Sequence, residues 1–154
     1  MKIFAITLFA ANMPDAVAFY EAVFSKKPIH TDDTSALFQF DSLYVNVILE
    51  SEARTLVAPQ QVAEASAGFS NLLTVQVEDV DAEASRLEAL GIKLVNGPLD
   101  QPWGIRALIF EDPTGHAWEF SQPLESKQSI CPSWKLDQLA QSLLFVDQCG
   151  VSPV

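Results

Sequence analysis

Hydrophobic and polar positions along the chain follow two periods, and each period occurs twice. Residues 3–9 and 72–77 alternate with a period of two, which predicts β-strands. A polar turn and a stretch with apolar residues at helical spacing follow each strand. The apolar stripes of the two predicted helices consist of Val17, Tyr20, Val23 and Phe24 and of Val80, Ala84 and Leu87. The pattern therefore predicts two strand–turn–helix units.

These two units repeat one sequence pattern. The segment that begins at Ile6 aligns with the segment that begins at Leu73, and the alignment matches Thr7 with Thr74. It also places Asn12 opposite Asp79, an N-cap residue type before the second helix, while Pro14 suits the first turn of the first helix and Gly91 suits the end of the second.

Short β segments complete each unit. They are predicted at residues 28–34, 36–40 and 43–50 in the first unit and at 92–97, 106–110 and 116–122 in the second. The turn of the second hairpin is "DPTG", in which Pro sets φ and Gly accepts a positive φ. We predict an α+β fold: two βαβββ modules that form a cupped mixed sheet with helices on its outer face. Each module alone buries one face, so the two share a core.

The predicted domain boundaries follow from this pattern. The first module spans 1–50, a linker spans 51–69, the second module spans 70–124, and a C-terminal extension spans 125–154. The extension has a partly helical apolar pattern of Trp134, Leu136, Leu139, Leu143 and Val146. We interpret it as a helix packed on its own subunit or on a dimer partner, or as a lid or partner-docking helix.

Composition narrows the classes of function. The chain has 154 residues with 20 acidic and 9 basic side chains, a net charge of -11. Nucleic acid is excluded as a partner because phosphate backbones require a basic footprint, whereas a cationic small molecule is attracted. The apolar runs are too short to cross a bilayer, so no membrane association is expected. We expect a cytoplasmic protein in which Cys131 and Cys149 are free thiols.

Candidate ligand-binding residues gather on the polar side of the predicted strands. Trp118 and Phe120 alternate with Glu119, so the two aromatic residues belong under the helices. The concave side collects Thr7, Tyr44, Asn46, Thr74, Gln76 and Glu119. Glu119 can contact a cation or act as a general base, or it can pair with Arg106, which can face either side.

The duplication, together with "DAVAFYEAVF", "VEDVDA" and "DPTGHAWEF", resembles the glyoxalase/bleomycin-resistance/dioxygenase (vicinal oxygen chelate) superfamily over residues 1–124. In its metal-dependent members, four strand positions supply the ligands, and the resemblance places Ala5, Asn46, Leu72 and Glu119 there. Alanine and leucine donate nothing to a metal, and zinc or nickel needs three to four donors. We therefore predict that the protein holds no metal and no cofactor. His30 and His116 lie outside the four positions and are interpreted as structural.

"DQPWG" is similar to a motif of the bleomycin-resistance proteins, in which the tryptophan lines a drug cleft at the interface of a homodimer. That resemblance implies that Trp103 lines a cleft and that this protein forms a homodimer; alternatively, Trp103 caps the edge of the core. A second cleft aromatic is not identified, and the candidates are Phe38, Phe40 and Tyr44.

Three functions remain open. The favoured one is a metal-free protein that binds a small aromatic or cationic compound, as in antibiotic resistance, and catalysis is not expected. The second is a lyase or isomerase similar to glyoxalase I. The third is a sensor or interaction protein that uses the C-terminal helix. The site residues rather than the fold decide among them.

Overall fold

The structure is a computed structural model that describes residues 2–124. The first module comprises β1 (Ala5–Ala10), α1 (Met13–Phe24), β2 (His30–Thr31), β3 (Ser35–Phe40) and β4 (Leu43–Leu49). The second comprises β5 (Leu72–Gln76), α3 (Val80–Ala89), β6 (Leu94–Asp100), β7 (Ile105–Glu111) and β8 (Ala117–Pro123). Between them lie α2 (Glu50–Val57) and a short 3-10 turn, η1 (Ala65–Ala67). The predicted C-terminal helix and both cysteines lie outside the described residues.

The strands form two four-stranded mixed sheets with the same topology. The orders are β1-β4-β3-β2 and β5-β8-β7-β6. In each sheet the first and last strands of the module pair in parallel, and the remaining pairs are antiparallel. The predicted α+β class and the two βαβββ modules are confirmed.

Both long helices begin at the polar residues that the repeat aligned. The Asn12 side chain accepts a hydrogen bond from the backbone N–H of Asp15 at 3.0 Å. The Asp79 side chain accepts two, from Asp81 at 2.9 Å and Ala82 at 3.0 Å. These bonds satisfy N–H groups that have no partner within the helix, so the predicted N-cap at Asp79 is confirmed.

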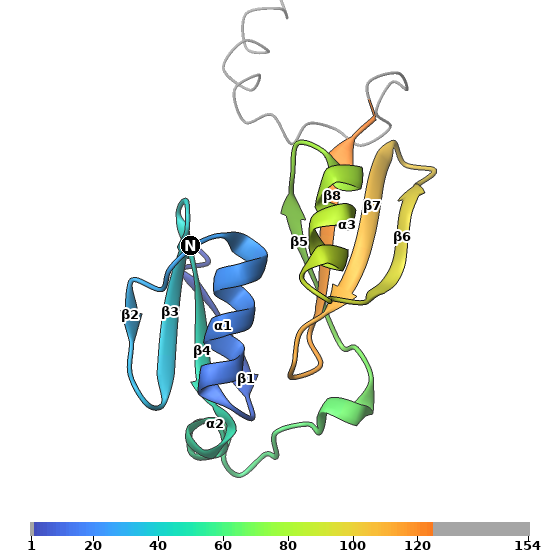
Figure 1. Ribbon diagram of the computed structural model, residues 1–154. Helices are drawn as coiled ribbons and strands as arrows, with labels where there is room; N and C mark the ends of the chain where they lie inside the picture. Colours follow the sequence, from blue (N-terminus) through green and yellow to red (C-terminus); the bar gives the residue numbers. More distant parts are fainter. Residues whose placement is uncertain (1, 125–154) are drawn as a thin grey trace, which may run out of the picture.

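The two modules share one core, and α1 lies between their sheets (Figure 1). Tyr20 on α1 packs against Phe38 of the first sheet, with ring centroids 5.7 Å apart. Phe24 on the same helix packs against Trp118 of the second sheet at 4.8 Å. Because α1 contacts both sheets, the apolar face of each sheet is turned toward the other module. We call the opposite face of each sheet its mixed face.

The strands form two sheets rather than one continuous sheet, since no hydrogen-bonded pair joins them within the described residues. The helix α1 buries aromatic side chains against both sheets, while its Ala18 and Ala22 remain exposed. The mixed face of each sheet therefore lies on the side opposite the shared core.

Polar contacts also join the modules. The Tyr20 hydroxyl donates a hydrogen bond to Asp112 Oδ2 at the start of the β7–β8 turn. Arg86 on α3 donates to the backbone carbonyls of Ala22 at 2.9 Å and Val23 at 2.5 Å, in the last turn of α1. The last turn of α1 has no basic residue of its own, so a residue of the other module satisfies its carbonyl groups.

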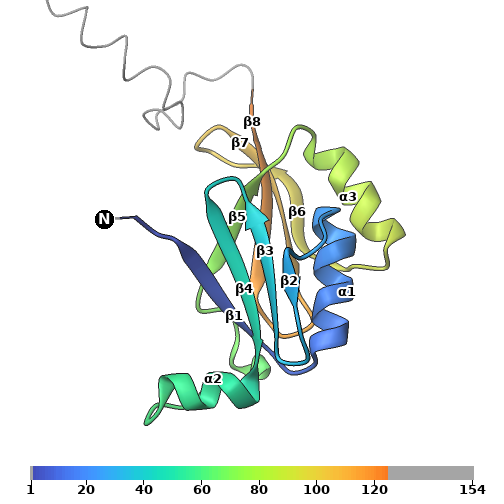
Figure 2. The same ribbon diagram turned by 90° about the vertical axis from the view of Figure 1, so that its left-hand side faces the viewer.

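The segment predicted as a linker contains the helix α2, which sequence reasoning missed. Its exposed Arg54 pairs with Glu50 at 3.5 Å, and its Ala53 is fully buried. This short helix continues directly from β4, at the lower end of the first sheet in Figure 2. None of the helices in residues 2–124 has the length and apolar character needed to span a membrane.

Candidate functional site

The two mixed faces carry matching pairs of residues at their centres. In the first sheet Thr7 on β1 lies beside Asn46 on β4. In the second sheet Thr74 on β5 lies beside Glu119 on β8, and the Thr74 hydroxyl donates a hydrogen bond to Glu119 Oε2 at 2.7 Å. The parallel register of each module therefore brings the four predicted residues to two equivalent places.

Small neighbours surround the Glu119 carboxylate. Ala117 and Ser121 lie on the same mixed face, one on each side of it along β8, and both are buried, whereas Glu119 is partly exposed. Because the side chains of Ala117 and Ser121 are small, a ligand group can approach the Glu119 carboxylate on the mixed face. Glu119 is thus an accessible acceptor on an otherwise largely apolar strand.

Arg106 does not pair with Glu119. Its guanidinium donates to both carboxylate oxygens of Asp81, at 2.7 and 2.8 Å, and to Asp100 at 2.7 Å. The hydrogen bonds to Asp81 and Asp100 raise the pKa of the Arg106 guanidinium above its ordinary value. Because Arg106 alternates with Ala107 and shares the side of Leu108, it lies on the helix side of the sheet, where it ties β7 to α3.

Trp103 lies in the turn between β6 and β7 and is 55% exposed. Gly104, which follows it, adopts a φ of +90°, a conformation that suits glycine. Glu119 on β8 pairs with Ile109 on β7. Ile109 lies four residues after Ile105, the first residue of β7. Four steps of a strand span about 13 Å, so Trp103 and Glu119 do not meet within one chain.

The other aromatic candidates separate into two groups. Phe38 is buried and Phe40 packs on Phe24 at 5.0 Å, so both belong to the core rather than to a cleft. Tyr44 lies on the mixed face of the first sheet, with its ring 4.9 Å from that of Phe4. Gln76 ends β5 and is exposed, at the edge of a pocket of about 470 Å³ that Phe24 and Phe40 also line.

The donor set does not fit the metal that the fold suggests. Asn46 and Glu119 offer oxygen atoms, but Ala5 and Leu72 have no donor atoms, and the two pairs lie on different sheets. Among residues 2–124 no three His, Cys, Asp or Glu side chains are grouped so as to hold a metal ion. No metal-dependent step is derived for these residues.

A buried carboxylate that sequence reasoning treated only as part of a turn organises the junction of the modules. Asp112 accepts hydrogen bonds from the Tyr20 hydroxyl, from Thr114 and from His116, whose Nδ1 is 2.8 Å away. Burial alone raises the pKa of Asp112, but the hydrogen bonds from His116 and Tyr20 outweigh it and lower the pKa to about 2. Asp112 is therefore ionised at neutral pH.

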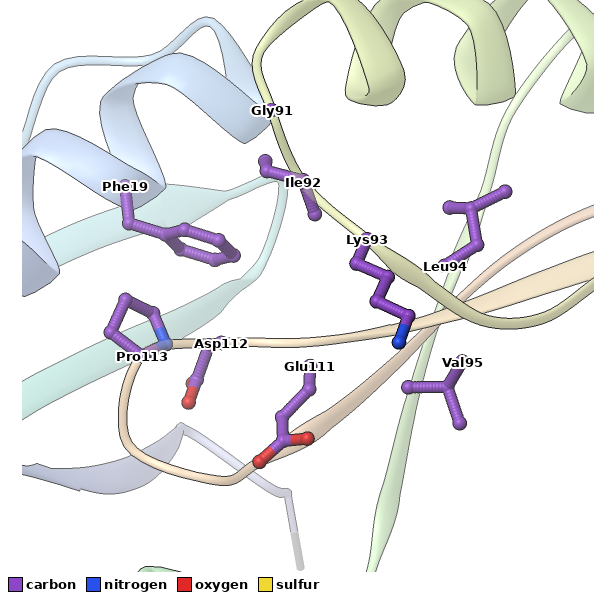
Figure 3. A pocket seen from close by; sticks show the side chains of 9 residues that line it. All are labelled: Phe19, Gly91, Ile92, Lys93, Leu94, Val95, Glu111, Asp112 and Pro113. Carbon is purple, nitrogen blue, oxygen red and sulfur yellow. The ribbon is translucent and has the colours of Figure 1, made fainter.

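Figure 3 shows a pocket of about 620 Å³ beside this junction, on the side of α1. It is lined by Phe19, Gly91, Ile92, Lys93, Leu94, Val95, Glu111, Asp112 and Pro113. Lys93, Glu111 and the buried Asp112 are the charged residues of its lining, and the other lining residues are mainly apolar. None of the predicted site residues lies in this pocket, so it is separate from the mixed faces.

A protein-family model places the chain in a family. The model of the Glyoxalase/Bleomycin resistance protein/Dioxygenase superfamily matches residues 2–120. The chain belongs to this superfamily. The match covers both modules, and it confirms the resemblance seen in the repeat and in the "DPTG" hairpin.

Several solved structures have the same fold. A glyoxalase/bleomycin resistance protein/dioxygenase from Nocardioides is 23% identical, with a TM-score of 0.72 over 83% of this chain and 87% of that one. A lactoylglutathione lyase from Agrobacterium tumefaciens is 21% identical, with a TM-score of 0.63 over 79% and 92%. A protein of unknown function from Agrobacterium tumefaciens str. C58 is 25% identical, with a TM-score of 0.66 over 80% and 95%.

Proposed function

We propose that this superfamily member is a homodimer that binds a small aromatic or cationic compound between mixed faces without a metal ion. The observation that carries the proposal is the accessible Glu119 carboxylate in its recess of small residues, combined with Ala5 and Leu72 at two expected ligand positions. One carboxylate without further donors suits an organic cation better than a metal ion.

The orientation of the sheets supports a second copy as part of the site. Within one chain each mixed face lies on the side opposite the shared core, so Thr7 and Asn46 do not meet Thr74 and Glu119 across that core. A two-fold related copy brings the first sheet of one protomer opposite the second sheet of the other. Large apolar side chains at the surface, Ile3, Phe4, Leu72, Leu99 and Trp103, are suited to such an interface.

Charge supports a cationic ligand. The net charge of -11 attracts cations over a distance, and Glu119 provides a specific acceptor on the second sheet. Trp103 and Tyr44 supply the aromatic surfaces on which a flat cation can stack once two copies meet. We propose that sequestering such a compound in the cytoplasm serves resistance to it.

Titration with proflavine, a flat aromatic cation, tests the binding site. We expect proflavine to quench tryptophan fluorescence and 9-anthracenecarboxylate, a flat anion, to bind more weakly. Trp103→Ala is expected to weaken proflavine binding by about 1–3 kcal/mol, the scale of one aromatic stack with its buried area. Glu119→Gln keeps the shape and removes the charge, so it should also weaken binding. Wild-type affinity in both variants would refute the site.

Two measurements on the purified protein test the rest of the proposal. Elemental analysis is expected to find no stoichiometric divalent metal, and one zinc, nickel or iron per chain that is lost in Glu119→Ala would contradict this. Light scattering is expected to give twice the chain mass. A mass that remains at 16.9 kDa across micromolar concentrations would contradict the dimer.

A lyase or isomerase similar to glyoxalase I is the second candidate, because Glu119 offers a carboxylate that could move a proton. The donors missing at Ala5 and Leu72 weigh against it. A sensor that uses the C-terminal extension is the third, and it would show a ligand-dependent change in hydrogen exchange in residues 125–154.

A further inference from the structure

A further pocket, separate from the two described above, lies where the two modules and the connecting segment meet. Glu119 does not line it. Its volume is about 260 Å³. It is lined by Thr7, Leu8, Phe9, Glu50, Val57, Gln61, Val62, Ala63, Glu64, Gly68, Ser70, Asn71, Thr114, Gly115 and His116. The turn between β7 and β8 thus approaches β1 and the start of α2 from the other module (Figure 1).

His116 brings a fixed imidazole to this pocket. Its Nδ1 lies 2.8 Å from Asp112 Oδ2, and the Asp112 side chain is completely buried. Because Asp112 is ionised, it can only accept a hydrogen bond, so Nδ1 of His116 carries the proton and donates it. This assignment of the tautomer follows from the hydrogen-bond network, and in the uncharged form of the ring it leaves the lone pair on Nε2.

Nε2 is accessible at the pocket. The His116 side chain is 19% exposed, and within residues 2–124 no buried side-chain nitrogen or oxygen lacks a hydrogen-bond partner. The hydrogen bonds of the ring involve Nδ1 alone, to Asp112 and Thr114. Nε2 therefore retains some exposed surface, and no protein donor occupies its lone pair.

The charged groups of the wall are of one sign. Glu50 and Glu64 are the acidic residues among those that line the pocket, and none of the lining residues is a lysine or an arginine. Arg54, the partner of Glu50 on α2, is not among the lining residues and is largely exposed. A wall with two carboxylates and an imidazole lone pair is complementary to a cation that has N–H donors. Leu8, Phe9 and Val57 provide apolar contact for a short hydrocarbon chain.

We propose that this pocket is a binding site for a small primary ammonium compound, which donates an N–H hydrogen bond to Nε2 of His116 while Asp112 fixes the ring. The role of Asp112 is to position His116 rather than to contact the ligand. This site goes beyond the mixed-face site, since one chain supplies all of its lining residues and neither Glu119 nor Trp103 is among them, although Thr7 belongs to both sites.

Nuclear magnetic resonance of the two histidine rings tests the proposal, with n-butylammonium as the probe. The chain contains only two histidines, so His30, which is exposed and pairs with Asp32, serves as the internal control. We expect n-butylammonium to shift the His116 resonances saturably and to leave those of His30 in place. Butyltrimethylammonium keeps the charge but has no N–H donor, and 1-butanol has no charge, so both should bind more weakly.

Variants complete the experiment. His116→Gln should weaken n-butylammonium binding about tenfold, the value of one charge-assisted hydrogen bond, and His30→Gln should leave it unchanged. If circular dichroism shows that His116→Gln does not fold, Glu64→Gln in the exposed connecting segment carries the test and should also weaken binding.

Equal shifts of both histidines, equal binding of butyltrimethylammonium, or wild-type affinity in the folded variants would overturn the proposal. Proflavine binding is tested with the Trp103→Ala and Glu119→Gln variants, whose positions do not line this pocket, so the two sites can fail independently.

Discussion

At the centre of its mixed face the first module carries Thr7 beside Asn46, whereas the second carries Thr74 beside Glu119. The backbone register is the same in both modules, and the threonine is retained. Only the second module has a charge, and there the threonine hydroxyl is bonded to the carboxylate. The comparison teaches that the duplicated frame positions a pair of side chains, while the residue on the last strand decides what that pair can bind.

The two helices differ in the same way. Both begin with a side-chain cap, and α1 then packs between two sheets, whereas α3 buries the single stripe of Val80, Ala84 and Leu87. α1 therefore belongs to the core of both modules. Substitutions should therefore lower the free energy of unfolding most where α1 meets the second sheet.

The largest effect is expected for Trp118→Ala. Trp118 is 2% exposed and packs against both Tyr20 and Phe24 of α1. Its truncation should lower the free energy of unfolding by about 3–5 kcal/mol, since it leaves a cavity at the module junction. Trp103→Ala, at a turn that is exposed in the single chain, is the matched control and should change the unfolding free energy of the single chain by less than about 0.5 kcal/mol, while any loss of dimer contacts appears as a change of mass in light scattering. Urea denaturation measures both, and equal losses would contradict the distinction.

Acid should act next, through Asp112. Its pKa in the folded protein is about 2, below the ordinary 3.8, so its contribution is complete above pH 4 and is lost as the pH falls from about 4 to about 2. The loss should be about 2 kcal/mol. Asp112→Asn should reduce this pH dependence of the unfolding free energy more than Asp81→Asn does, because Asp81 is on the surface. An equal dependence of the unfolding free energy on pH in the two variants would contradict the prediction.

A smaller effect is expected for Tyr20→Phe, which removes the hydroxyl that links α1 to the second module. Asp112 keeps its other donors, so the free energy of unfolding should fall by about 1–2 kcal/mol. Tyr44→Phe is the control, because Tyr44 belongs to a partly exposed mixed face and should tolerate the change. Thermal denaturation distinguishes them, and a larger loss in Tyr44→Phe would show that the link is not important.

The smallest effects should come from the helix caps. Asp79→Ala removes two hydrogen bonds at the start of α3, and Asn12→Ala removes one at the start of α1. Each should cost about 1 kcal/mol, with the larger loss at Asp79. A larger loss at Asn12 would indicate that the burial of α1, rather than the number of cap bonds, determines the cost.

Local features of this fold could be predicted from the sequence. Alternation identified the buried sides of β5 and β8, and the cap residue Asp79 identified the start of α3, because both depend on neighbours in the chain. The helix α2 was missed, since it is short and only Ala53 on it is buried. The sequence did contain one signal for α2: Glu50 and Arg54 are four residues apart, the spacing of an ion pair on a helix surface.

The candidate site was less predictable, because it depends on partners far apart in the chain. Arg106 is 25 residues from Asp81, and Tyr20 is 92 residues from Asp112, and neither pairing has a sequence signature. Alternation shows which face of a strand is apolar but does not show what covers it. The contacts of α1 with both sheets and the pocket at His116 therefore required the structure.

The cap that Arg86 places on α1 has a consequence for the order in which the protein can mature on the ribosome. The carbonyl groups of Ala22 and Val23 reach their final partner only after residue 86 has been synthesised, more than 60 residues later. At about 5–20 residues per second, the emerging first half spends several seconds without it. The contact of Phe24 with Trp118 also waits for the second half, so α1 can complete its packing only after that half has been synthesised.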